Sequence, residues 1–144
     1  MSRVRRTVLA IGVGVLILGL WSAGVAGAAT KLRASLSGAK EVPQAGNGRG
    51  TARLTIDVGK SRVCYSITLR SVGTAVAGHI HKGGKRTAGP VFVGLFDKPT
   101  KRPKGCVKAK KSQLRAIRNH PGRYYVNVHT AKFPAGAARG QLHK

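Results

Sequence analysis

Two histidines one residue apart, His79 and His81, have the types and spacing best suited to chemistry in this chain. They fall in a predicted strand, residues 75–81, and residues two apart on a strand project from the same face. A His-x-His pair on one face is a recurrent spacing of metal ligands, because imidazole nitrogen binds Zn²⁺ and Cu²⁺. His129 lies in a second predicted strand, so three imidazoles converge if the two strands are neighbours. One hypothesis is therefore a zinc or copper site formed by His79, His81 and His129.

The alternative for the same histidines is a hydrogen-bonded polar network that needs no cofactor. Its predicted polar partners are Glu41, Asn127 and Arg139, with Glu41 and Arg139 joined by a bidentate bond. The chain has only three acidic residues, so no carboxylate is available to offset a divalent cation. For that reason the sequence favours the network over the metal site, and no cofactor is expected.

Catalytic arrangements of other kinds are absent from the sequence. No Gly-x-Ser-x-Gly motif occurs, and no second carboxylate lies beside Glu41 to form an acid–base pair with it. Both cysteines are expected to be oxidised, so neither is available as a nucleophile. No glycine-rich phosphate loop follows a predicted strand. The sequence therefore predicts a domain that is not an enzyme.

Strands must position these side chains, because alternation of apolar and polar residues dominates the later chain. Residues 52–58 and 63–69 alternate strictly, with a tight turn at residues 59–60 between them. Residues 112–119 are the one helix candidate. Residues 97–105, with two prolines and four basic residues, are predicted to be loop. About seven strands and one short helix predict an all-β fold, an antiparallel β-sandwich.

The start of the chain has the three parts of a secretory signal peptide. Three arginines in the first six residues precede a charge-free apolar run, which ends in Ala26-Gly27-Ala28. We expect cleavage after Ala28, or alternatively after Ala29, so that residues 1–28 are the signal peptide and residues 29–144 the domain. The other reading is an uncleaved membrane anchor, since the run is long enough to span a bilayer. The predicted localisation is secreted or extracytoplasmic.

The two cysteines, Cys64 and Cys106, are the only ones in the chain. An even cysteine count in an exported protein predicts a disulfide. Closing a loop of about 43 residues stabilises a fold by roughly 4 kcal/mol in the chain-entropy model. A domain this small buries a limited core, so the bond is expected to matter for stability.

The charge of the chain is strongly positive, at +24. Loss of the three signal-peptide arginines lowers it by three, to +21. Such a charge attracts polyanions, and the predicted partners are anionic envelope polymers or lipids at residues 82–86 and 98–111. Aromatic residues are too few for a platform on which bases stack, so no specific nucleic acid is expected. The domain is expected to be a monomer.

Four motifs in the later chain resemble those of the CHRD domain family, in the family's order. They are residues 36–43 (LSGAKEVP), residues 78–83 (GHIHKG) with 89–91 (GPV), residues 125–130 (YVNVHT), and residues 134–136 (PAG) with 139–142 (RGQL). The family is named for chordin, an extracellular antagonist of growth factors, and includes bacterial exported proteins. The resemblance implies an immunoglobulin-like sandwich and an exported bacterial member of the family. The His-x-His strand is also similar to that of copper/zinc superoxide dismutases, as a likeness of fold alone.

These observations predict an exported non-catalytic binding or structural domain of the CHRD type. Two alternatives remain open. One is a His-based Zn- or Cu-binding sandwich that resembles a superoxide dismutase fold. The other is a polyanion binder at the cell envelope, which acts through its charge.

Overall fold

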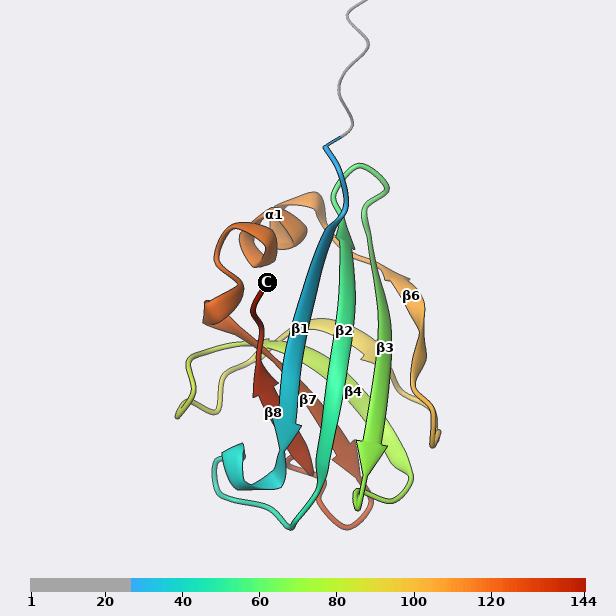
Figure 1. Cartoon of the computed structure of the whole chain (residues 1–144), viewed down its shortest axis with the longest axis vertical. Helices are drawn as coiled ribbons and strands as arrows, with labels where there is room; N and C mark the ends of the chain where they lie inside the picture. Colours follow the sequence, from blue (N-terminus) through green and yellow to red (C-terminus); the bar gives the residue numbers. More distant parts are fainter. Residues whose placement is uncertain (1–26) are drawn as a thin grey trace, which may run out of the picture.

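Eight strands and one short helix make up the fold in the computed structural model, which describes residues 27–144 (Figure 1). The strands are β1 (Thr30–Ser37), β2 (Arg49–Asp57), β3 (Arg62–Arg70), β4 (Ala75–Lys82), β5 (Val91–Phe96), β6 (Lys104–Lys108), β7 (Tyr124–Thr130) and β8 (Ala138–Gln141). The helix is α1 (Lys111–Asn119), and two 3-10 turns are η1 (Gly38–Lys40) and η2 (Pro121–Arg123). The all-β prediction with one short helix is confirmed. The predicted signal peptide lies outside the described residues, except for residues 27 and 28.

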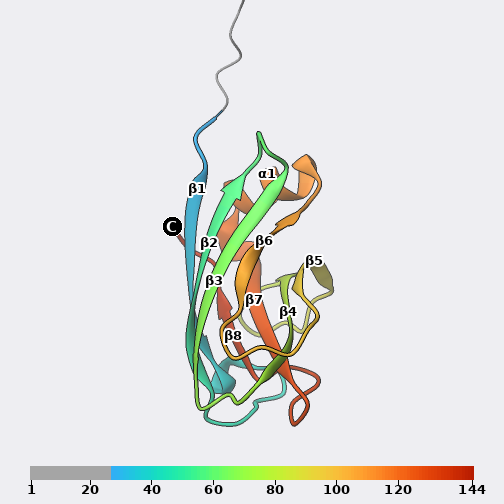
Figure 2. The same cartoon turned by 90° about the vertical axis from the view of Figure 1, so that its right-hand side faces the viewer.

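The strands form one antiparallel sheet in the order β5-β4-β7-β8-β1-β2-β3-β6. The sheet folds over itself into two facing layers, with β1, β2 and β3 in one and β4, β5 and β7 in the other (Figure 2). β8 links the layers, because it pairs with β7 on one side and with β1 on the other. The fold therefore brings β4 beside β7, although more than 40 residues separate them in the sequence.

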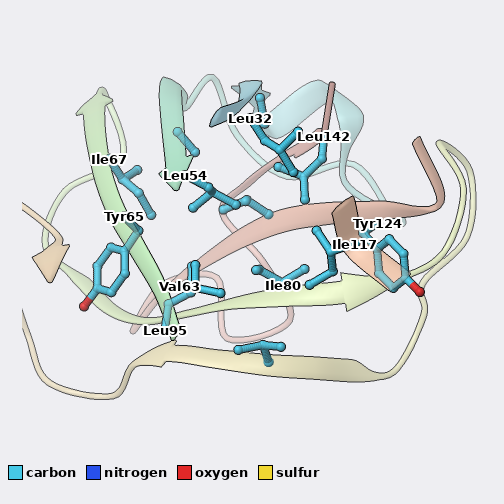
Figure 3. Close-up of a cluster of buried hydrophobic side chains, with 14 of the residues drawn as sticks. Leu32, Leu54, Val63, Tyr65, Ile67, Ile80, Leu95, Ile117, Tyr124 and Leu142 are labelled. Carbon is cyan, nitrogen blue, oxygen red and sulfur yellow. The ribbon is translucent and has the colours of Figure 1, made fainter. Parts of the chain in front are cut away.

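The core fills the space between the two layers, where the apolar half of each alternating strand points (Figure 3). Leu32 and Leu54 approach from one layer and Ile80 from the other, each with at most 2 % of its surface exposed. Helix α1 lies at one end and inserts Leu114 and Ile117, which are fully buried. Burial of a side chain of this size contributes about 1.5–3 kcal/mol. The polar half of each strand is thereby left on the outer faces of the sandwich.

β6 is the strand that the sequence did not predict. It begins at Lys104, inside the loop predicted for residues 97–105, so that prediction is wrong for residues 104 and 105. Apart from Val107, its residues are basic or small. It forms because its backbone pairs with β3, where Cys64 lies directly opposite Cys106. The predicted Cys64–Cys106 disulfide is confirmed and joins these two strands. A cross-strand bond of this kind holds an edge strand whose side chains add little to the core.

Candidate metal centre

The pairing of β4 with β7 brings the three histidines together. In the register Ala77 lies opposite His129 and His79 opposite Asn127, so the histidines share the outer face of this layer. Ile80, between the two β4 histidines, points into the core. One ring nitrogen of each histidine lies within 4.8 Å of one on each of the others, and Nδ1 of His79 is 3.1 Å from Nε2 of His129. The convergence on which the metal hypothesis depends is therefore present.

Backbone carbonyl groups hold two of the three rings in place. Nδ1 of His81 lies 2.8 Å from the Gly89 carbonyl oxygen, and Nδ1 of His129 lies 3.0 Å from that of Pro134. A carbonyl oxygen can only accept, so in each neutral ring Nδ1 carries the proton and Nε2 keeps a lone pair. The same bond to a backbone carbonyl fixes the tautomer and orientation of histidines that bind metals. Both rings thus keep a lone pair on Nε2; that of His129 lies 3.1 Å from Nδ1 of His79, and that of His81 has no hydrogen-bond partner.

Nε2 of His81 is buried and has no hydrogen-bond partner in the structure. A buried acceptor left unpaired costs about 1–3 kcal/mol, so such an atom calls for an explanation. The ring is held firmly, because it stacks on Tyr125 with the centroids 5.0 Å apart and the planes 9° apart. A cation at the histidine cluster would complete the bonding of this atom.

Burial lowers the pKa of all three histidines. For His79 desolvation is the main cause, the neighbouring His129 and His81 add to it, and its pKa falls to about 4. Desolvation likewise lowers the pKa of His81 and of His129. The neutral imidazole is the form that binds a metal ion. The cluster is therefore in its ligand form at neutral pH.

Arg139 on β8 contacts the residues that hold His81 in place. Its guanidinium lies 3.4 Å from the centroid of the Tyr125 ring, whose other face stacks on His81. The two terminal nitrogens of Arg139 donate to the carbonyl oxygens of Thr87 and Gly84, each at 2.8 Å. These bonds fix the β4–β5 loop, which also supplies the Gly89 carbonyl. Arg139 therefore positions His81 indirectly, through the Tyr125 ring and through the loop that carries Gly89.

Tyr125 is a site residue that the sequence analysis missed. Its hydroxyl accepts a hydrogen bond from the Gly89 backbone at 3.0 Å, while its ring stacks on His81. The signal was available, because Tyr125, Asn127 and His129 alternate on one strand and so share a face. Apolar alternation draws attention to its neighbour Tyr124 instead, which faces the core.

Glu41 and Asn127 lie together in the polar network, but the bidentate Glu41–Arg139 bond is not formed. The Asn127 amide donates to Glu41 at 3.5 Å, whereas Arg139 uses its donors on the loop carbonyls instead. Glu41 is only 6 % exposed, and burial raises its pKa to about 7 against the opposing effects of the Arg139 charge and the Asn127 amide. A carboxyl group is thus buried on this face without an ion pair.

The CHRD domain profile matches residues 32–142 of the chain. The chain belongs to the CHRD domain family. The matched segment begins within β1 and ends just past β8, so it contains β2 to β8, most of β1 and every residue of the candidate site. No curated protein and no solved structure matches this CHRD domain. None of the helices within residues 27–144 has the length and apolar character needed to cross a membrane.

Proposed function

We propose that this CHRD domain is an exported, non-catalytic binding domain that holds one divalent transition-metal ion, Zn²⁺ or Cu²⁺, on His79, His81 and His129. The observation that carries the proposal is the buried, unpartnered Nε2 of His81, in a cluster where one ring nitrogen of each histidine lies within 4.8 Å of one on each of the others. The large majority of buried polar side-chain atoms are hydrogen-bonded. Oε1 of Glu41 and Oδ1 of Asn127 are also unpaired, but neither belongs to the cluster of imidazole nitrogens.

The donor set fits such an ion. Three imidazoles suit zinc and copper, and ligand nitrogens about 2.0–2.1 Å from a tetrahedral ion lie about 3.3 Å from one another. His79 and His129 are already at 3.1 Å, so only the His81 ring has to draw closer. The fourth position would be filled by water or by a donor group from a partner. The bonds to Gly89 and Pro134 orient two rings before any metal arrives.

The opposing consideration is charge. The chain carries +24, and Arg139 lies behind the cluster without a neutralising carboxylate. Like charge lowers the affinity for a cation, but the effect of exposed charges is screened over about 8–10 Å at moderate salt. The Arg139 guanidinium also faces Tyr125 and two carbonyl oxygens, which disperse its charge. We expect the local donor set to outweigh the background charge.

Calorimetric titration of untagged, metal-free mature protein with Zn²⁺ and Cu²⁺ tests the proposal. We expect one ion per chain, and loss of binding in His81→Ala and in His129→Ala. The electron paramagnetic resonance spectrum of the copper form should show nitrogen ligands. His120→Ala is the matched control, since His120 is exposed and lies outside the cluster. Absence of binding, or binding that survives both substitutions, would leave the polar network as the function of this cluster.

Export is tested separately. We infer that the domain begins at residue 29, because Ala26-Gly27-Ala28 ends an apolar run in the order of a signal peptide. Mass spectrometry of protein recovered outside the cytoplasm should give a chain that starts at Ala29 or Thr30. An intact Met1 on a membrane-bound chain would instead support the anchor.

A further inference from the structure

The outer face of the layer formed by β1, β2 and β3 carries arginines in pairs. Arg33 lies directly opposite Arg53 across β1 and β2, and Arg49 lies directly opposite Arg70 across β2 and β3. All four side chains are exposed. Like charges placed opposite each other destabilise an antiparallel pair, so this arrangement works against the stability of the sheet.

A row of hydroxyl groups separates the two arginine pairs. Ser35, Thr51 and Thr68 lie opposite one another on the three strands and are exposed. The row is about 10 Å long, and the arginine pairs stand about 6.6 Å to either side of it, as strand geometry requires. We name these seven residues the cationic track. It runs across the three strands, with the hydroxyl groups in a central row and the guanidinium groups on both sides of that row.

No carboxylate forms an ion pair with the track within the described part of the chain. Within residues 27–144 the only ion pair joins Lys60 to Asp57, at 4.0 Å. The other two acidic residues of the chain are Glu41, which is buried, and Asp97, which follows β5 on the other layer. The arginine forks are therefore free to bind anions from outside.

Two hollows of about 300 Å³ each adjoin the hydroxyl row. One is lined by Thr51 and Thr68 together with three arginines of the track, Arg49, Arg53 and Arg70. The other adjoins Ser35 and is lined by Lys40, Lys85, Arg139, Gln141 and His143, of which Arg139 and Gln141 already donate to backbone carbonyl oxygens. Each is large enough for an oxyanion, and their common row gives a ligand a path from one to the other.

We propose that the cationic track binds a linear polyanion that carries phosphate or sulfate groups and lies across β1, β2 and β3. Arginine matches such groups, because its planar fork donates two parallel hydrogen bonds to an oxyanion. Hydroxyl groups between the arginines add donors that a merely charged surface lacks. No aromatic ring belongs to the track, so bases have nothing to stack on and a nucleic acid is disfavoured. The seven residues of the track lie on the layer opposite the histidine cluster, and none of them belongs to that cluster.

Binding of inorganic polyphosphate to the mature protein, measured by calorimetry over a range of salt, tests the proposal. The track variant carries Arg33→Gln, Arg49→Gln, Arg53→Gln and Arg70→Gln. The control variant loses the same charge from exposed positions elsewhere: Lys108→Gln, Lys111→Gln, Arg115→Gln and Arg123→Gln. We expect the track variant to bind at least about tenfold more weakly than the control, with a salt slope lower by about 3, at roughly 0.7–0.9 per phosphate contact. Equal weakening of the two variants would overturn the proposal.

A second variant keeps the charge and removes the hydroxyl groups, with Ser35→Ala, Thr51→Val and Thr68→Val. We expect a several-fold loss of affinity at an unchanged salt slope, and unchanged affinity would overturn the track as the binding site. Dextran sulfate should bind as tightly as polyphosphate if the track accepts both groups, and more weakly if phosphate is the natural group. Polyglutamate of equal charge should bind more weakly than either. Equal binding of polyglutamate, or tighter binding of a single-stranded oligonucleotide, would contradict the proposed ligand class.

Discussion

Replacement of Glu41 by glutamine tests the electrostatics of the site most directly. The pKa of Glu41 is about 7 in the folded protein against a usual value of 4.5, chiefly because the group is buried. Between these pH values the folded state holds a proton that the unfolded state has released. The contribution of protonated Glu41 to the free energy of unfolding is therefore fully present below pH 4.5 and is lost as the pH rises through 7. The folded and unfolded pKa values differ by about 2.5, and each pH unit is worth 1.36 kcal/mol, so the free energy of unfolding falls by an amount on the order of 3 kcal/mol.

Glu41→Gln removes this dependence, since the amide does not ionise. Urea unfolding of both proteins across this pH range gives the difference in their free energies of unfolding. We expect the free energy of unfolding of the variant, relative to that of the wild type, to rise by about 3 kcal/mol as the pH rises from below 4.5 to above 7. The three histidines are present in both proteins, so their own pH dependence cancels in the difference.

Asp97→Asn is the matched control, because it removes a carboxylate from an exposed position. Its difference from the wild type measures the effect of losing one exposed carboxylate, and this effect is subtracted from the result for Glu41→Gln. A flat difference for Glu41→Gln would refute the reasoning, since it would mean that Glu41 ionises in the folded protein as readily as in the unfolded chain. A difference that falls with rising pH would show that the Arg139 charge outweighs burial.

Three further predictions concern stability. Cys64→Ser with Cys106→Ser should lower the free energy of unfolding by about 2–5 kcal/mol, measured by urea unfolding, because it releases a loop closed across 42 residues; an unchanged value would mean that the reduced chain keeps β6 in place. Arg139→Gln should cost about 3 kcal/mol or more, because it removes two charged hydrogen bonds. It should also speed hydrogen exchange in residues 83–90, and unchanged exchange there would contradict the anchoring role. Gly136→Ala should lower the melting temperature by several degrees, because Gly136 has a φ of 145° and an added Cβ would collide with the Glu41 carboxylate; wild-type melting would show that the loop relaxes freely.

Local alternation was enough to predict much of the fold. It identified most of the strands and placed His79 and His81 on one face, because the period of two is a property of the strand itself. The disulfide was predictable as well, since only Cys64 and Cys106 are present. The family motifs were visible for the same reason, as each is a short run of neighbouring residues.

The sequence could not show which strands are neighbours. Whether His129 meets His79 depends on β4 pairing with β7, and this pairing follows from how the whole core packs. β6 was missed because its pairing with β3 owes little to its own side chains. Arg139 was predicted to bond with Glu41, but its neighbours in space are a tyrosine ring and a loop that the sequence places far away.

The positively charged sites also depend partly on local sequence and partly on tertiary structure. The sequence drew attention to residues 82–86 and 98–111, where basic residues are dense along the chain. Arg33, Arg53 and their counterparts on the track are isolated in the sequence and read as ordinary exposed strand residues. Composition determined that the protein is strongly basic and local alternation determined which side chains face outward. Only the tertiary structure decided that four scattered arginines flank one row of hydroxyl groups, because strand register is set by contacts between distant residues.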